Sequence, residues 1–123
     1  ARNAVYEKKR LEGVPLTIKR SYMLKSKDRQ TPTIRMGPLL RSLVTFNYLN
    51  FMDANYNINH IYDIIFCRNC LIYFDRPTSE AIVNKLCQNL LPGGYFFIGH
   101  SETLNSLNVP LVQIAPTIYQ KQV

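Results

Sequence analysis

The sequence predicts an α/β fold, and three observations support this prediction. Residues 61–67 are almost continuously apolar, which is typical of a strand buried on both faces of a parallel sheet. Residues 77–91 have the apolar spacing of an amphipathic helix, and residues 95–99 form a second short apolar run. A strand, a helix and a strand in this order indicate an α/β sheet.

The first half of the chain predicts smaller elements. Residues 1–20 are typical of a basic helical piece and a turn, interrupted at Gly13 and Pro15. Residues 19–41 are polar and basic, which favours a small peripheral subdomain or a long excursion of the chain, and residues 33–36 could form a short strand inside it. Residues 43–48 alternate apolar and polar side chains and predict another strand.

The second half predicts clear element boundaries. Asp75 or Thr78 is expected to cap the helix at residues 77–91, and the Pro-Gly-Gly sequence at residues 92–94 is expected to end it. Residues 111–115 and 117–120 flank Pro116 and predict two short final strands or one kinked strand.

Charge is concentrated in the first third of the chain. The 123 residues are 46% hydrophobic and carry a net charge of +7, which indicates a globular protein of one domain or less. Residues 1–41 hold 11 basic and three acidic side chains, whereas residues 42–123 hold four and five. This basic segment would attract nucleic acid, an acidic membrane or an acidic protein helix, unless it is merely a solvated face. The apolar runs are shorter than the roughly 18 residues of a membrane span.

Three cysteines, Cys67, Cys70 and Cys87, form an odd set in a chain with no secretory signal, which favours reduced thiols in the cytoplasm. The C-x-x-C spacing of the first two can indicate a dithiol redox site, although the apolar residues that follow disfavour it. We predict no metal site, because a structural zinc needs four ligands. The chain starts with Ala1, and we expect that an earlier part of the protein is missing.

Polar residues follow the predicted strands at positions 47–50, 67–69 and 100–102. Ligands of α/β sheets bind beyond the carboxyl ends of the strands, so this pattern predicts a site there. Arg68 and Asn69 need a ligand, a carboxylate or loop carbonyls as partners, while Tyr73 could belong to the site or the core. His100, Ser101 and Glu102 are adjacent in one turn and cannot form a catalytic triad. No glycine-rich phosphate loop occurs in the sequence.

Two blocks of sequence resemble a known family. They are IIFCRNCLIYFD at residues 64–75 and LPGGYFFIGHSE at residues 91–102, with further similarity at residues 1–6, 46, 50–51 and 116–119. They resemble the CheR family, the S-adenosylmethionine-dependent methyltransferases that esterify glutamate side chains of bacterial chemotaxis receptors. Two residues depart from the family pattern: Cys70 replaces the usual small aliphatic residue, and Phe51 replaces the usual leucine.

The resemblance implies a fold and a domain division. The fold would be the C-terminal part of a Rossmann-like class I methyltransferase sheet with a small inserted β-subdomain. Residues 1–18 would be a helix end and a turn, residues 19–42 the basic β-subdomain, and residues 43–123 the C-terminal portion of the S-adenosylmethionine-binding domain. The family's N-terminal helical domain and glycine-rich cofactor loop would precede residue 1, so we expect this chain alone to be incomplete and inactive.

The resemblance also implies site residues. Four of them would contact S-adenosylmethionine: Asn50, Phe51, Cys67 and Arg68. Asn69 and Tyr73 would line the approach of the substrate carboxylate, and Arg68 and Tyr73 would be the catalytic pair.

The implied partners are acidic helices of chemoreceptor cytoplasmic domains and, in some members of the family, a receptor tail peptide bound by the β-subdomain. Neither nucleic acid nor membrane insertion is expected. Two alternatives remain: a methyltransferase-like module that binds a partner without activity, and a C-x-x-C dithiol redox protein.

Overall fold

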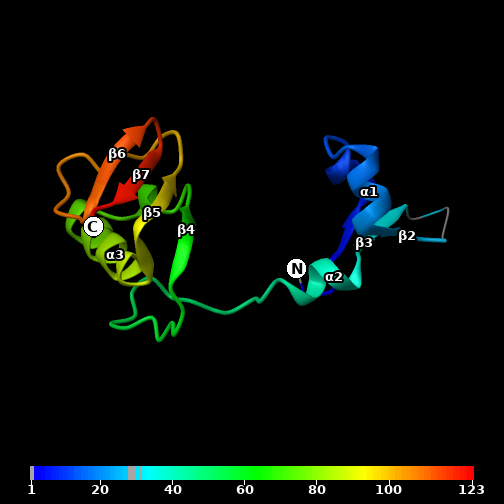
Figure 1. The fold of residues 1–123 in the computed structure, drawn as a ribbon, viewed down its shortest axis with the longest axis horizontal. Coiled ribbons are helices and arrows are strands. Elements are labelled where there is room, and N and C mark those ends of the chain that lie inside the picture. Colours follow the sequence, from blue (N-terminus) through cyan, green and yellow to red (C-terminus); the bar gives the residue numbers. More distant parts are fainter. Residues whose placement is uncertain (1, 28–29, 31) are drawn as a thin grey trace. The chain divides into compact units, whose positions relative to one another are not determined.

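The computed structural model describes residues 2–27, 30 and 32–123 (Figure 1). Ala1, Asp28, Arg29 and Thr31, which belong to the predicted basic segment or to the family resemblance, lie outside the described residues. The chain divides into a first unit, residues 1–48, and a second unit, residues 49–123. No helix among the described residues is long and apolar enough to cross a bilayer.

A three-stranded antiparallel sheet forms the first unit. Its strands are β1 (Val5–Glu7), β2 (Met23–Lys25) and β3 (Thr33–Met36), in the order β1-β3-β2. The 3-10 helix η1 (Lys8–Leu11), the helix α1 (Leu16–Tyr22) and the helix α2 (Pro38–Ser42) complete it. The strand predicted at residues 33–36 is confirmed, and α1 begins directly after Pro15. The prediction of a helical piece and a turn for residues 1–20 was wrong at β1, which pairs with β3 through Tyr6 and Ile34.

The predicted divisions after residues 18 and 42 differ from the units of the structure. Strand β1 lies in the same sheet as β2 and β3, and the boundary between the units follows residue 48.

The strand predicted at residues 43–48 is absent. These residues form no hydrogen-bonded ladder, and their apolar side chains are exposed, up to 90% for Tyr48. Alternation of apolar and polar residues indicates only that a segment can be half-buried in a sheet; a strand also needs a neighbour with which to exchange hydrogen bonds. No described strand pairs with residues 43–48.

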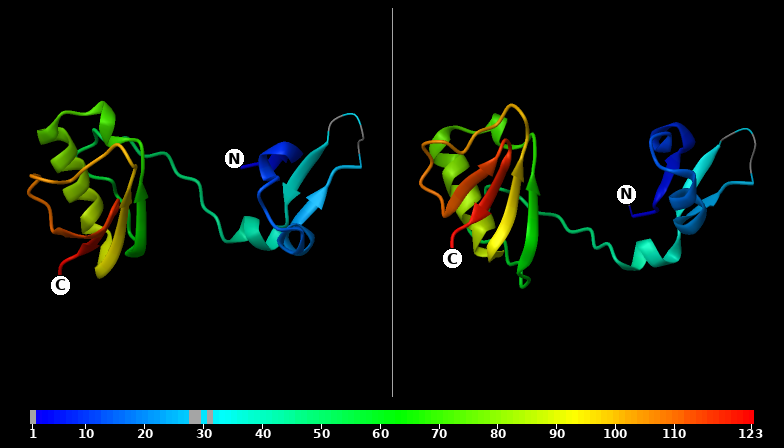
Figure 2. Two further views of the ribbon diagram at one scale, coloured as in Figure 1. Left: turned by 90° about the horizontal axis from the view of Figure 1, so that it is seen from above. Right: turned by 45° about the horizontal axis from the view of Figure 1, so that its top comes forward.

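A mixed four-stranded sheet forms the second unit, with helix α3 along one face (Figure 2). Its strands are β4 (Tyr62–Cys67), β5 (Leu90–Ile98), β6 (Leu111–Ala115) and β7 (Ile118–Lys121), in the order β4-β5-β7-β6. Strands β4 and β5 are parallel and the other pairs antiparallel. The α/β prediction is therefore confirmed, with the final two strands forming a hairpin rather than one kinked strand.

Helix α3 (Arg76–Gln88) supplies one side of the core. Asp75 is the N-cap, and its Oδ1 accepts a hydrogen bond of 2.9 Å from the backbone N–H of Thr78. Ile82, Val83 and Cys87 are almost fully buried and pack in one cluster with side chains of β5 and β7, including Phe96, Ile98 and Tyr119.

The predicted end of this helix was wrong. Helix α3 ends at Gln88, and Pro92, Gly93 and Gly94 lie within β5. There the register with β4 shifts, because Tyr62 lies opposite Leu90 while Ile64 lies opposite Tyr95. A Cβ atom on Gly94 would lie 2.9 Å from the carbonyl oxygen of Asp63, so only glycine lets the two backbones approach this closely. The turn residues therefore mark an irregularity in a strand.

Strand β4 is buried on one face only, which corrects the prediction of burial on both. Cys67 belongs to the core cluster, and Ile65 packs against it. Ile64 and Phe66 point the other way and remain 48% and 68% exposed. The ring of Phe66 stacks on that of Phe97 in β5 at 4.7 Å between centroids. Helix α3 covers the first face, and β4 lies at one edge of the sheet.

Candidate functional site

Two turns meet at the carboxyl ends of β4 and β5. Because these strands are parallel and Cys67 lies opposite Ile98, the residues that follow each strand start from neighbouring positions. Residues 68–71 form the turn after β4, and residues 99–102 form the turn after β5. In open α/β sheets this edge is where ligands bind. The structure therefore brings together two of the three polar clusters that the sequence singled out.

Arg68 and Asn69 lie exposed in the turn after β4. Asn69 has a φ of 57°, in the left-handed region that asparagine tolerates better than most residues. Tyr73 follows in the 3-10 helix η2 (Leu71–Tyr73), and its side chain is 79% exposed. The alternative of Tyr73 as a core aromatic is therefore wrong for this chain. All three side chains are accessible to a ligand.

Glu102 links the two turns, a contact that our sequence analysis did not predict. Its Oε1 accepts hydrogen bonds from the backbone N–H groups of Cys70 at 2.8 Å and Leu71 at 2.7 Å. Its Oε2 accepts from the N–H groups of Asn69 at 2.9 Å and Gly99 at 2.6 Å. We call this arrangement the Glu102 clamp. Its signal in the sequence was the acidic residue in the second turn, where we considered only a catalytic triad.

The clamp sets the charge of Glu102. Partial burial of this side chain pushes its pKa up, but the four backbone hydrogen bonds outweigh burial and hold the pKa below the ordinary 4.5. The carboxylate is therefore ionised at neutral pH. Gly99 makes room for it, because a Cβ atom at this position would lie 2.8 Å from Oε2 of Glu102 and closer still to Oδ1 of Asn69.

Cys67 is the least accessible of the predicted site residues. Its side chain is 3% exposed and packs in the hydrophobic core. Burial, reinforced by Cys70 and Glu102, raises the pKa of Cys67 to about 12. A thiol that stays protonated is a poor nucleophile, so this environment disfavours dithiol redox chemistry. A contact between Cys67 and a cofactor would have to use its backbone.

Asn50 and Phe51 lie in a turn attached to α3. Oδ1 of Asn50 accepts a hydrogen bond from the N–H of Met52 at 3.1 Å, and Asn50 is exposed. The carbonyl oxygen of Phe51 accepts from Nζ of Lys85 at 2.9 Å and from the hydroxyl of Tyr56 at 3.0 Å. These bonds fix the turn to the second unit although it belongs to no strand.

An aromatic cluster joins this turn to the residues after β4. The ring centroid of Phe51 lies 6.1 Å from that of Phe74, edge to face, and 6.4 Å from that of Tyr56. Burial raises the pKa of Tyr56, and the nearby Cys67 and Asp53 raise it further. Tyr56 therefore contacts Phe51 and packs against the core cluster that contains Cys67. Our list of predicted site residues omitted both Tyr56 and Phe74; Phe74 belongs to the block at residues 64–75, whereas Tyr56 belongs to no motif.

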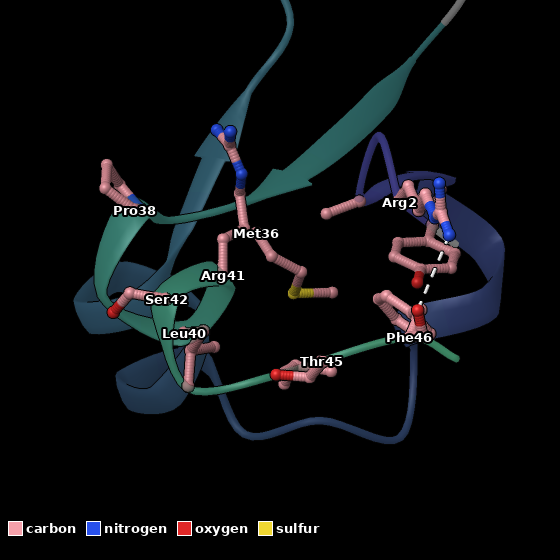
Figure 3. Close-up of a pocket in the computed structure, with 11 residues that line it drawn as sticks. Arg2, Met36, Pro38, Leu40, Arg41, Ser42, Thr45 and Phe46 are labelled. Atoms are coloured by element: carbon pink, nitrogen blue, oxygen red, sulfur yellow. Dashed lines mark hydrogen bonds between the residues drawn. The ribbon is translucent and has the colours of Figure 1, made fainter.

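The first unit contains a separate pocket of about 750 Å³ (Figure 3). Its apolar lining includes Met36, Leu40 and Phe46, and Arg2 and Arg41 are the two cations on its wall. An Nη atom of Arg2 donates a 3.5 Å hydrogen bond to the carbonyl oxygen of Phe46. None of the predicted site residues lines this pocket.

Most basic side chains among the described residues of the first unit lie on its surface. Nine of these are exposed: Arg2, Lys8, Lys9, Arg10, Arg20, Lys25, Lys27, Arg35 and Arg41. The described residues of this unit include two carboxylates, Glu7 and Glu12, and Glu7 lies 3.0 Å from Nζ of Lys9. The described part of this unit is thus cationic on its surface.

The chain is similar to known proteins over almost its whole length. Residues 1–119 match the family described as "CheR methyltransferase, SAM binding domain". The chain is similar to chemotaxis protein methyltransferase 2 of Pseudomonas aeruginosa, with 35% identity over 119 residues that cover 97% of this chain and 42% of the relative. The chemotaxis protein methyltransferase of Borreliella burgdorferi is 35% identical over 121 residues, 98% of this chain and 41% of the relative.

The chemotaxis protein methyltransferase of Escherichia coli is 29% identical over 119 residues, 97% of this chain and 42% of the relative. The chain thus spans about two fifths of the length of these curated relatives.

Proposed function

We propose a function for this chain on the ground that it belongs to the CheR methyltransferase family, whose S-adenosylmethionine-binding domain matches residues 1–119. The proposed reaction is methyl transfer from S-adenosylmethionine to glutamate side chains of bacterial chemoreceptors, which gives glutamate methyl esters. The observation that carries the proposal is the exposed Arg68–Asn69 pair at the carboxyl end of β4, held by the Glu102 clamp. The location of this pair at the sheet edge where α/β folds bind ligands supports its role.

The residues present fit part of a site for S-adenosylmethionine. Phe51 offers a half-buried aromatic ring and Asn50 an exposed amide, which suit the flat face and the polar edge of an adenine. Arg68 offers an exposed guanidinium in the same unit. These assignments, and a backbone contact from Cys67, are part of the proposal.

The proposed chemistry requires little acid or base catalysis. S-adenosylmethionine supplies a methyl group already activated by a sulfonium. A glutamate carboxylate is a nucleophile at neutral pH, so no proton has to move before its oxygen would bond to the methyl carbon. The bond from the methyl carbon to sulfur would break at the same time, and S-adenosylhomocysteine would leave as a neutral thioether. The protein has to align the carboxylate and exclude water. Arg68 would hold the carboxylate, Asn69 would line its approach, and the exposed hydroxyl of Tyr73 would orient it.

The proposed partners are acidic. The exposed cations of the first unit favour the acidic helices of a chemoreceptor cytoplasmic domain, and the proposed location is accordingly the cytoplasm. Residues 19–42 would act as the family's small β-subdomain, with residues 43–123 as the C-terminal portion of the cofactor-binding domain. Within residues 19–42, β2 lies at an edge of its sheet, and an extended receptor tail could add a strand there.

An arginine substitution tests the proposal. In the whole gene product, Arg68→Ala should lower kcat/KM for receptor methylation at least tenfold, equivalent to about 1.4 kcal/mol of transition-state stabilisation. Arg76→Ala is the matched control, because Arg76 is an exposed arginine of the same unit whose Nη2 donates to the carbonyl oxygen of Ser106 at 2.7 Å. An Arg68→Ala protein as active as the Arg76→Ala protein would contradict the role of Arg68.

A binding module without activity is the second candidate. The exposed apolar face of the second sheet, which includes Ile64, Phe66 and Ile114, favours it because such patches mark interaction surfaces. This alternative predicts that the wild-type protein binds a receptor fragment and transfers no methyl group.

A further inference from the structure

We propose that Glu102 is a positioning residue of the methyl-transfer site: its carboxylate fixes the backbone of residues 69–71 and thereby sets where Arg68 and Asn69 present their side chains. This inference rests on the proposed function. Glu102 acts through the backbone of the turn and needs no contact with the cofactor or the substrate.

The backbone conformation of the turn after β4 is suited to bind an anion. Asn69 has a left-handed φ of 57° and Cys70 is right-handed, with φ −114° and ψ −42°. Successive N–H groups in such alternating conformations converge and form a concave anion-binding arrangement. In many proteins a phosphate fills this arrangement. Here the carboxylate of Glu102 fills it, with three N–H groups of residues 69–71 at 2.7–2.9 Å.

The fourth hydrogen bond ties the turn to the sheet. Oε2 of Glu102 also accepts from the N–H of Gly99, the residue directly after β5. Oε2 therefore joins Asn69 in the turn after β4 to Gly99 at the end of the neighbouring strand, while Oε1 binds the turn alone. Because β4 lies at the edge of its sheet, this carboxylate holds the turn from the β5 side.

Glu102→Gln should move the turn without unfolding the protein. Of the four residues whose N–H groups the carboxylate binds, Asn69 is exposed, Cys70 is half-buried, and Leu71 and Gly99 are buried. Glutamine keeps one side-chain oxygen that can accept two of these hydrogen bonds, so we expect the variant to lose part of its stability and still fold. A turn that moves by about 1 Å, by contrast, can lower the rate of a positioned reaction about 100-fold.

Glu102→Gln and Glu80→Gln form a matched pair for the test. Glu80 belongs to the same unit, and its Oε2 accepts one hydrogen bond of 2.8 Å from the N–H of Asn108, in the loop before β6. The two substitutions make the same chemical change in two loop anchors, of which only one adjoins Arg68. We would measure kcat and KM for receptor methylation in the whole gene product, at a temperature where both variants are folded, together with amide hydrogen exchange.

The expected result is a selective effect. Glu102→Gln should accelerate exchange at the amides of Asn69, Cys70, Leu71 and Gly99 and lower kcat at least tenfold. Glu80→Gln should change kcat by less than twofold. Equal losses of kcat in the two variants, or an unchanged kcat despite faster exchange at the four amides, would overturn the inference.

The two proposals can fail separately. A wild-type protein without methyl transfer would contradict the proposed function. In that case amide hydrogen exchange would still test whether Glu102 fixes the turn. Unchanged exchange rates at residues 69–71 in Glu102→Gln would refute this role, and faster exchange there would support it.

Discussion

The three cysteines differ in their access to solvent and hence in reactivity. Burial raises the pKa of Cys67 to about 12 and that of Cys87 to about 11, so both thiols are protonated at neutral pH as well as shielded. Cys70 is only half-buried, and its Sγ donates to the carbonyl oxygen of Arg68 at 3.2 Å.

We predict that iodoacetamide at pH 7.5 modifies Cys70 at least tenfold faster than Cys67 or Cys87 in the folded protein. The physical reason is that alkylation needs an accessible thiolate, which the two buried cysteines do not offer. Peptide mass spectrometry over a time course measures the three rates, and the same reaction in denaturant is the control. Rapid modification of Cys67 in the folded state would show that this thiol is reactive and would support a redox role for the C-x-x-C pair.

Glu102 should make the stability of the protein depend on pH in acid. Its folded-state pKa lies below the ordinary 4.5, so the carboxylate stabilises the folded state above pH 4.5. Below pH 4.5 the unfolded protein binds a proton at Glu102 first, which begins to reduce this stabilisation. When the pH also falls through the lower pKa of the folded state, the folded protein binds the proton too, and the stabilisation disappears.

The measurement is the difference in unfolding free energy between the wild-type protein and Glu102→Gln, obtained by urea denaturation from pH 7 down to pH 2.5. The difference should be constant at neutral pH and shrink below pH 4.5. A difference that stays constant across the acid range would show that the four hydrogen bonds do not favour the ionised carboxylate.

Among the elements, the close contact between the end of α1 and the residue after β3 depends on a glycine. The N–H of Gly37 donates to the carbonyl oxygen of Tyr22 at 2.7 Å, and a Cβ atom on Gly37 would lie 2.9 Å from that same oxygen. A side chain here would push apart the end of α1 and the residue after β3.

We therefore expect Gly37→Ala to destabilise the first unit by about 1–3 kcal/mol, the usual cost of forcing extra volume into a packed site. Gly13→Ala is the matched control in the same unit, since no atom lies within 4 Å of its Cβ position. Circular dichroism during urea denaturation measures both variants. If the two variants are equally stable, the close approach of Gly37 to the carbonyl oxygen of Tyr22 does not restrict position 37 to glycine.

The accuracy of the sequence-based predictions varied with the kind of contact each element needs. Helix α3 was predicted because its apolar spacing and the cap at Asp75 are local signals, and the strands of the second unit were predicted from their apolar runs. The segment at residues 43–48 was predicted wrongly, because alternation carries no information about whether a neighbouring strand exists. The face of Ile64 and Phe66 was also predicted wrongly, since an apolar run indicates the capacity for burial and the structure covers one face only.

The same distinction applies to the candidate site. Arg68 and Asn69 could be found because they follow an apolar strand directly. The sequence shows an acidic residue in the second turn but not its partners, because Glu102 binds backbone N–H groups 31 to 33 positions away, and any residue type can supply them. The predicted roles of Asn50, Phe51, Cys67, Arg68, Asn69 and Tyr73 remain predictions.

For the whole molecule, the exposed cations of the first unit predict a salt-dependent association with receptors. We expect affinity for an acidic chemoreceptor fragment to fall at least tenfold as ionic strength rises from about 0.01 M to 0.15 M, while the Debye length shrinks from about 30 Å to 8 Å. Titration calorimetry measures this, with sucrose at equal osmolality as the control. Affinity that does not respond to salt would identify these cations as a solvated surface.

The identity of the reaction product tests the central claim most directly. The whole gene product would be incubated with a chemoreceptor cytoplasmic fragment and S-adenosylmethionine labelled on the methyl group, and the receptor then treated with mild base. Esters hydrolyse in base, whereas methyl groups on nitrogen or on a thioether do not. We predict a label on the receptor that base releases as methanol, and that is absent when the modified glutamates are replaced by glutamine. A receptor that stays unlabelled, or a label that resists base, would contradict the account.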